Sequence, residues 1–249
     1  MIFRDFHCHT TFCDGINTPE EMVISAIKKG MTQLGLVCHS YTFFDESYCI
    51  KKDIIGNFLA EMNRLKEKYS DKIELFCGVE QDYYSDYPTE GFDYVIGSVH
   101  YMKIGDRYYS LDSSPEEFFD VLDKKFGGDY NLLAESYYET VSDVVRKTGA
   151  DIIGHFDIIS KFVEKEDYSR ISHLDYITAA KKAVDRLIPY VKPFEINTGA
   201  IARGYRTYPY PSAEIICYIK EKGGKLILSS DAHSKENLMF LFDKWENIL

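Results

Sequence analysis

Short apolar runs rich in β-branched and aromatic residues recur along the whole chain. Each run has the length of a β-strand, and a run of this kind predicts a strand with little exposure to solvent. We count seven such runs, at residues 2–6, 34–38, 73–79, 94–99, 152–154, 193–196 and 225–229.

Segments with helical periodicity separate these runs. The stretch Thr18-Pro19-Glu20-Glu21 is a capping box with Pro at the first helical position, and it predicts a helix that ends at Gly30. Met22, Val23, Ala26 and Ile27 share one face of that helix. The same start signal recurs at Ser114-Pro115-Glu116-Glu117. Further helices are expected at about 54–68, 130–148, 172–188, 212–222 and 235–247.

The repeated alternation of strand and helix, with no evident linker, predicts a parallel sheet in an α/β protein. No Gly-rich GxGxxG motif follows the first run, so a dinucleotide-binding open sheet is not favoured. We therefore expect a barrel of about seven strands. At 249 residues, one domain spanning 1–249 is the expected organisation.

Composition and charge narrow the functional class. Hydrophobic residues make up 45% of the chain, which is typical of a globular protein. The net charge of −11 argues against a nucleic-acid partner, because phosphate backbones are bound through clustered Lys and Arg. The six cysteines form no CxxC pair, and we find neither a signal peptide nor an apolar run of membrane-spanning length. These features predict a cytoplasmic protein without a membrane partner.

Histidines and carboxylates lie where the predicted strands end. In a parallel barrel all carboxyl ends of the strands meet at one face, so side chains from distant parts of the sequence should converge there. His173 lies instead at a predicted helix start, and we expect it to be a surface or capping residue. The residues at strand ends are His7, His9, His39, Glu80, His100, His155, Asp231 and His233.

The spacing of these residues suits metal ions. Side chains alternate along a strand, so His7 and His9 point to the same side, as do Asp231 and His233. Imidazole and carboxylate ligands together favour zinc, iron or manganese over calcium or magnesium. The candidates outnumber the ligands of a single catalytic zinc, so more than one ion is expected.

The motifs as a set resemble the PHP (polymerase and histidinol phosphatase) superfamily, most closely its stand-alone histidinol-phosphatases. The resemblance runs from end to end, and the first and last motifs in combination are the most specific. The motifs are His7-Cys8-His9-Thr10, Cys13-Asp14-Gly15, Cys38-His39-Ser40, Gly78-Val79-Glu80, Gly97-Ser98-Val99-His100, Gly154-His155-Phe156-Asp157, Glu195-Ile196-Asn197-Thr198 and Ser230-Asp231-Ala232-His233.

The resemblance implies a distorted (β/α)7 TIM-like barrel (the PHP fold) with a trinuclear metal centre. By motif, the first ion would be held by His7, His9, Glu80 and Asp231. The second would share Glu80 as a bridge with His100 and His155, and the third would be held by Asp14, His39 and His233. Some family members carry His near the position of Asp14, a departure that bears on the metal of the third site.

The resemblance also implies a phosphate-binding arginine in the segment 197–206. Arg203 is the first candidate and Arg206 the second, because a guanidinium matches the oxygens of a phosphate group. The implied reaction is hydrolysis of L-histidinol phosphate, a step of histidine biosynthesis, by a metal-bridged hydroxide. Asp231 or a nearby His would protonate the leaving alkoxide, so Asp231, His233 and Arg203 are the candidate catalytic residues.

Three other functions fit parts of the pattern. A PHP phosphoesterase acting on nucleotides or other small phosphates would use the same chemistry. An amidohydrolase also uses His-x-His on a first barrel strand, but Asp14, Glu80 and the Asp231-Ala232-His233 spacing fit it poorly. A non-catalytic, metal-bound accessory module is the third alternative.

Overall fold

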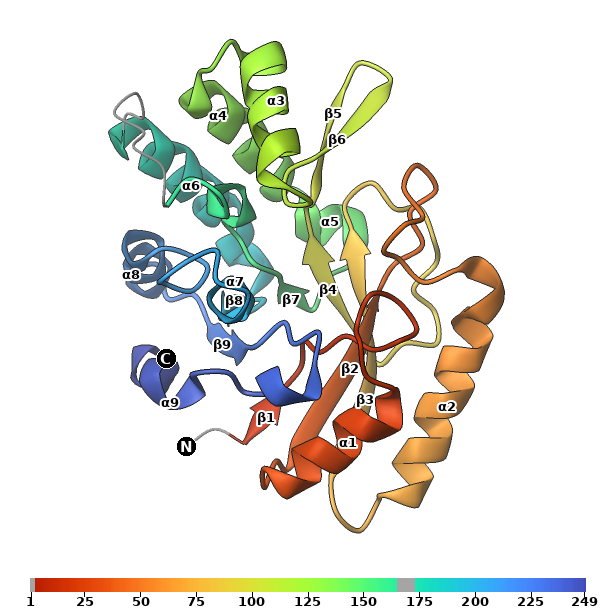
Figure 1. The fold of residues 1–249 in the computed structure, drawn as a ribbon. Coiled ribbons are helices and arrows are strands. Elements are labelled where there is room, and N and C mark those ends of the chain that lie inside the picture. The colour runs from red at the N-terminus through yellow and green to blue at the C-terminus, as the bar shows by residue number, and fades with distance from the viewer. Residues whose placement is uncertain (1–2, 165–172) are drawn as a thin grey trace.

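Seven parallel strands form the centre of the protein in the computed structural model, which describes residues 3–164 and 173–249 (Figure 1). Their order in the sheet is β1-β2-β3-β4-β7-β8-β9, and every neighbouring pair is parallel. All seven predicted strands are confirmed. They are β1 (Arg4–Asp5), β2 (Gln33–His39), β3 (Glu74–Asp82), β4 (Tyr94–Ser98), β7 (Ile152–Ile153), β8 (Phe194–Asn197) and β9 (Leu226–Ser229).

The sheet closes on itself beyond the ends of its first and last strands. Cys8, just after β1, forms a parallel bridge with Ala232, just after β9. The amide of Ala232 donates to the carbonyl of His7 at 3.1 Å, and the amide of His9 donates to the carbonyl of Ala232 at 2.8 Å. The predicted seven-stranded barrel is therefore confirmed, with its closure at the carboxyl ends of β1 and β9.

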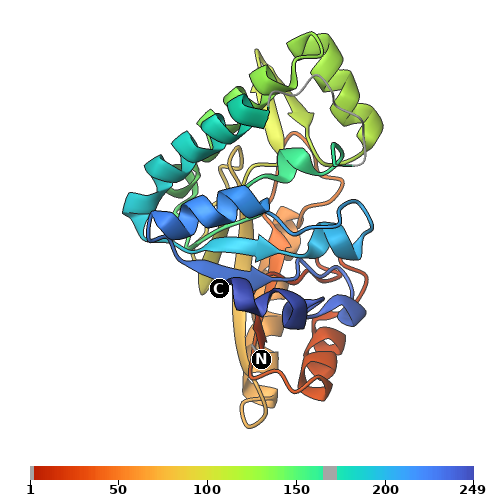
Figure 2. The same ribbon diagram turned by 90° about the vertical axis from the view of Figure 1, so that its left-hand side faces the viewer.

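Helices surround the sheet (Figures 1 and 2). One apolar cluster joins α1 and α2 to β2 and β3, and a second joins α3, α4, α6 and α8 to β7 and β8. No helix within the described ranges has the length and apolar character needed to cross a membrane. The α-helices are α1 (Pro19–Lys28), α2 (Ile55–Lys68), α3 (Pro115–Phe126), α4 (Tyr130–Val141), α5 (Val144–Thr148), α6 (His173–Leu187), α7 (Gly199–Ala202), α8 (Ala213–Glu221) and α9 (Phe242–Trp245), with 3-10 turns at Lys52–Ile54, Ile158–Ser160, Ile188–Tyr190, Lys235–Asn237 and Glu246–Ile248.

The two helix start signals act as expected. The hydroxyl of Thr18 accepts from the amide of Glu21 at 3.3 Å, while the Glu21 carboxylate accepts from the amide of Thr18 at 2.9 Å. Ser114 likewise accepts from the amide of Glu117 at 3.2 Å. These bonds satisfy amides that a helix start leaves without partners.

Two helices that we predicted to be continuous are interrupted in the structure. The helix expected at 130–148 breaks between α4 and α5, where the hydroxyl of Ser142 donates to the carbonyl of Glu139. The helix expected at 235–247 is reduced to the short α9 and a 3-10 turn on each side of it, because distant polar groups take its backbone partners. The buried carboxylate of Asp5 accepts from the amide of Met239, and Lys29 donates to the carbonyl of Leu238. The first residue of the 172–188 prediction lies outside the described residues.

A hairpin that we did not predict follows β4. Strands β5 (Tyr101–Ile104) and β6 (Arg107–Ser110) pair antiparallel through a two-residue turn at Gly105-Asp106. Gly105 has a φ of 62°, a left-handed conformation that glycine adopts without strain. The turn residues between tyrosine-rich segments were the signal for this hairpin. It projects from the barrel beside the loop that follows β2 (Figure 1).

Candidate metal centre

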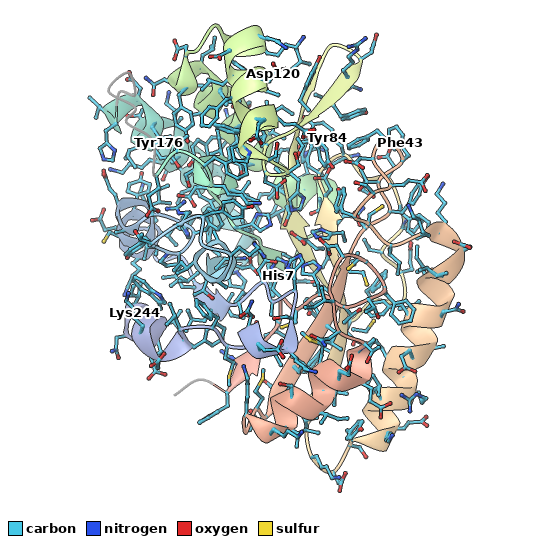
Figure 3. All side chains as sticks on the ribbon, in the orientation of Figure 1. His7, Phe43, Tyr84, Asp120, Tyr176 and Lys244 are labelled. Atoms are coloured by element: carbon cyan, nitrogen blue, oxygen red, sulfur yellow. The ribbon has the colours of Figure 1, made fainter. Side chains whose placement is uncertain are left out.

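The residues predicted at strand ends converge at one end of the barrel, which we call the mouth. They come from all of the parallel strands except β8. His7 lies near the middle of the molecule (Figure 3). His7, His9, His39, Glu80, His100, His155 and Asp231 are buried, His233 is half-buried and Asp14 is exposed.

Glu80 lies at the centre of this cluster. Its Oε2 atom is 3.1 Å from Nε2 of His7, 3.3 Å from Nε2 of His9 and 3.0 Å from Nδ1 of His39. Its Oε1 atom is 2.8 Å from Nε2 of His155 and 3.1 Å from Nε2 of His100. One carboxylate thus faces two groups of imidazoles, one group for each oxygen.

Asp231 approaches the same nitrogens of His7 and His9 that face Glu80. Its Oδ1 atom is 3.7 Å from Nε2 of His7 and 3.4 Å from Nε2 of His9. Asp231 has a φ of 49°, a left-handed conformation that Asp tolerates better than most residues. The carboxylate is also held by Arg203, whose Nη2 donates to Oδ2 at 2.8 Å.

A third group lies closer to solvent. Oδ2 of Asp14 is 3.2 Å from Nε2 of His233 and 3.5 Å from Nε2 of His39. The His9 ring stacks on the rings of both His39 and His233, with centroids 4.3 Å apart in each pair. In each of three sets of residues, the potential ligand atoms all lie within 4.8 Å of one another. These sets are His7, His9 and Glu80; His39, Glu80 and His100; and His9, Asp14, His39 and His233.

Several buried atoms of the cluster are better placed to bind a metal ion than to form hydrogen bonds with one another. Nε2 of His7, Nε2 of His9, Nδ1 of His39 and Oε2 of Glu80 are shielded from solvent and have no hydrogen-bond partner in the described structure. A buried polar atom without a partner is costly, and such atoms are uncommon in folded proteins. Atoms that face one another at about 3 Å without hydrogen bonding are arranged as ligands of a shared divalent cation.

The charges of the cluster perturb its pKa values strongly. Burial raises the pKa of Glu80, but the positive charges of His39, His7 and His100 outweigh burial and hold that pKa well below its usual range. Burial and the charge of His39 lower the pKa of His9, yet its close contacts with Asp231, Cys13 and Glu80 raise that pKa to about 10. Without a metal, His9 therefore retains its proton at neutral pH.

Two carboxylates behind the cluster were not predicted as site residues. Oε1 of Glu195, on β8, lies 2.7 Å from Nδ1 of His7, and its Oε2 accepts from the amide of His155 at 3.0 Å. Oδ2 of Asp82 lies 3.2 Å from Nδ1 of His100. The sequence signal for Asp82 was its spacing from Glu80, since residues two apart on a strand face the same side.

Glu195 is expected to raise the metal affinity of the mouth without contacting a metal. A carboxylate on the far nitrogen of a ligating imidazole fixes its orientation and tautomer. Glu195→Gln should weaken metal binding about 10- to 100-fold, because the amide cannot replace the charge of the carboxylate. Titration of the metal-free variant with zinc measures this change. An affinity equal to that of the original protein would contradict this role for Glu195.

The two predicted phosphate-binding arginines lie in different surroundings. Arg203 lines a cavity of about 280 Å³ at the mouth, together with Asp14, Glu80 and Asp231. Arg206 is not among the residues that line this cavity. It is buried, and its Nε donates to Glu164 at 3.1 Å while its Nη1 donates to the hydroxyl of Ser160. Its guanidinium lies over the ring of Tyr210. These contacts correct our expectation that Arg206 is available to substrate.

A buried lysine that we did not predict as a site residue also lines this cavity. Lys161 lines the cavity and its ammonium donates to the carbonyl of Asp112 at 2.5 Å. Its Nζ atom also lies 3.5 Å from Oδ2 of Asp112. His173, by contrast, lies on the surface, as expected, and pairs with Glu214 at 2.8 Å.

Fold and site together define an α/β barrel whose candidate metal ligands gather at the carboxyl ends of the strands. The chain belongs to the PHP family, because the PHP domain model matches residues 5–199. The resemblance inferred from the motifs is thereby confirmed.

Individual relatives agree with this assignment. The chain is 23% identical to the histidinol-phosphatase of Bacillus subtilis, over 96% of this chain and 97% of that protein. A crystal structure from Listeria monocytogenes superposes with a TM-score of 0.83 and 21% identity, over 97% of this chain and 99% of that one. The histidinol phosphate phosphatase of Lactococcus lactis, solved in complex with zinc, L-histidinol and phosphate, gives a TM-score of 0.74 and 22% identity, over 98% of this chain and 91% of that one.

Proposed function

We propose that this protein is a metal-dependent phosphatase that hydrolyses L-histidinol phosphate to L-histidinol and phosphate. The observation that carries the proposal is Glu80, whose two oxygens face separate groups of imidazoles in one pocket that Arg203 also lines. The substrate is proposed from the relatives, which include the Bacillus subtilis histidinol-phosphatase and the Lactococcus lactis enzyme solved with L-histidinol and phosphate.

Three divalent ions of zinc, iron or manganese per chain are proposed as the cofactor. Mixed imidazole and carboxylate ligands favour these metals. Glu80 would bridge two of the sites, since each of its oxygens faces its own imidazoles. The proposed ligand sets are His7, His9, Glu80 and Asp231; Glu80, His100 and His155; and Asp14, His39 and His233.

When bound, such ions lower the pKa of water and neutralise charge on phosphoryl oxygens. Side chains of the protein would position the substrate and donate a proton to the leaving alkoxide. Arg203 presents a planar guanidinium to the phosphate, held in place by its bond to Asp231. Lys161 adds a second cation to the cavity wall. Asp231 or His233, which also line the cavity, would give the proton to the leaving alkoxide.

Release of inorganic phosphate across a panel of esters tests this proposal. The panel contains L-histidinol phosphate, nucleoside monophosphates and 4-nitrophenyl phosphate, each assayed with zinc or manganese. The account predicts the highest kcat/KM for L-histidinol phosphate. A preference for nucleotides would assign the protein to another phosphoesterase activity, and no phosphate release by metal-loaded protein would favour an accessory module.

Arg203→Ala is expected to weaken substrate binding. It removes a charge-assisted contact to phosphate, so KM for L-histidinol phosphate should rise on the order of 10- to 100-fold, with a smaller change in kcat. Steady-state kinetics measure both constants. An unchanged KM would remove Arg203 from the site.

Arg206→Ala provides the contrast within the same loop. Among the residues that the structure describes, it leaves Glu164 and the buried Asp157 without a cationic partner, so the expected effect is a loss of about 3 kcal/mol in the free energy of unfolding. KM should stay near that of the original protein. Denaturant unfolding and kinetics on the same preparation check the two statements, and a raised KM with unchanged stability would reverse the roles of the two arginines.

A further inference from the structure

A second cavity adjoins the metal mouth. It has a volume of about 560 Å³ and lies between the loop after β2, the β5–β6 hairpin and α3. Asp45, Tyr101 and Ser110 line both cavities, so the two spaces share a wall. In Figure 3 the labels of Phe43, Tyr84 and Asp120 mark this end of the molecule, above His7.

Aromatic rings form a continuous path from the metal mouth to Asp45. The ring of Tyr48 contacts the ring of His39 edge-on with centroids 4.8 Å apart, and it lies roughly parallel to the ring of Tyr101 with centroids 6.2 Å apart. The hydroxyl of Tyr101 donates to Oδ2 of Asp45 at 2.8 Å. Phe44 packs edge-on against Tyr101 with centroids 4.9 Å apart. A flat or apolar group attached to a phosphate at the mouth would therefore lie against aromatic faces.

Asp45 ends this path with a negative charge that only neutral donors contact. Besides Tyr101, it accepts from the amide of Ser47 at 3.0 Å and from the Ser47 hydroxyl at 2.6 Å. Within the described residues, no lysine, arginine or histidine lies within ion-pair distance of Asp45. Lys51, in the same loop, pairs with Glu46 instead, at 3.3 Å.

Apart from the metal cluster, the cavity at the mouth is lined by one carboxylate besides Asp45 among the described residues, and that carboxylate, Asp112, differs in this respect. Asp112 faces the ammonium of Lys161, which offsets its charge. Burial raises the pKa of Asp45, but the bonds from Ser47 and Tyr101, together with the charge of Lys51 beyond ion-pair distance, outweigh burial and leave that pKa below its ordinary value. Asp45 is therefore ionised at neutral pH and available to a cation.

We propose that Asp45 is the residue that selects a cationic leaving group. This inference rests on the proposed phosphatase function and deepens it. The substrate class is the phosphate monoesters of small amino alcohols, whose ammonium or protonated heteroaromatic ring binds Asp45 while the rest of the molecule lies against Tyr48 and Tyr101. A charge-assisted hydrogen bond and the faces of the rings both favour a cation at this place.

The test compares two substrates in the full-length, metal-loaded protein. L-Histidinol phosphate carries a cationic leaving group, and 3-phenylpropyl phosphate is an ester of similar length whose leaving group is uncharged. Asp45→Asn should lower the ratio of their kcat/KM values on the order of 10- to 100-fold, mainly through KM of the cationic ester. Asp53→Asn is the matched control, because it makes the same exchange at an exposed position that lines neither cavity, and it should leave the ratio unchanged.

An unchanged ratio in folded Asp45→Asn, with folding checked by circular dichroism, overturns the inference while the phosphatase proposal stands. If the original protein hydrolyses neither ester, the phosphatase proposal fails. The role of Asp45 is then tested separately by equilibrium dialysis, which measures the binding of L-histidinol to the metal-loaded protein and to the variant. Weaker binding by Asp45→Asn then supports the role of Asp45, and equal binding by the two proteins overturns it.

Discussion

Glu80→Gln is expected to abolish phosphate release, with a loss in kcat on the order of 1,000-fold or more. The substitution keeps the size of the side chain and removes the charge that two groups of imidazoles face. A neutral amide cannot bridge two cations as a carboxylate does, so two of the three proposed metal sites lose a ligand at once. Metal bound per chain, measured by plasma emission spectrometry, should fall together with activity.

Glu74→Gln is the control for this change, because Glu74 begins the same strand but is exposed and hydrogen-bonded to Gln33. The control should keep both activity and metal. Full activity in Glu80→Gln, or loss of activity with unchanged metal content, would contradict the bridging role of Glu80.

Removal of the metals is the second change with a large expected effect. Dialysis against a chelator should reduce phosphatase activity to background, and addition of zinc or manganese should restore it. The chemistry depends on the ions because phosphate-monoester hydrolysis is among the slowest uncatalysed reactions, and the described cavity offers cations besides metals only at Arg203, Lys161 and protonated histidines. Full activity in the presence of chelator would refute the metal-dependent scheme.

Rebinding of metal should release protons. In the metal-free protein the pKa values of His9 and His100 are raised to about 10, so both imidazoles carry protons at pH 8. A ligating imidazole must be neutral, and metal affinity should therefore increase as the pH rises from about 6.5 toward 10. Calorimetric titration in two buffers of different ionisation enthalpy measures the protons released. A metal affinity that falls across this range would show that these histidines are not ligands.

The strands could be predicted because each has a local signal. Every parallel strand coincides with an apolar run, and the caps at Thr18 and Ser114 mark helix starts within four residues of sequence. The C-terminal segment could not be predicted in the same way. Its helical pattern is overridden by Asp5, whose carboxylate binds the amide of Met239 across 234 positions of sequence.

The convergence of the site residues was also predictable, since parallel strands carry their carboxyl ends to one face. The contacts that individual side chains make in the folded protein could not be predicted from the sequence. Arg203 and Arg206 look equivalent in sequence. Only the fold places Arg203 beside Asp231 and Arg206 beside Glu164. Glu195 was visible as part of a motif, but its role follows from the 2.7 Å contact with His7, 188 positions away.

The most direct test of the account is a crystal structure of the metal-loaded protein with anomalous diffraction measured at the absorption edges of zinc, iron and manganese. The account predicts three anomalous peaks at the mouth, two of them sharing Glu80 and the third beside Asp14 and His233. Anomalous peaks only at the protein surface, or an ordered mouth with Glu80 bound to no ion, would contradict it.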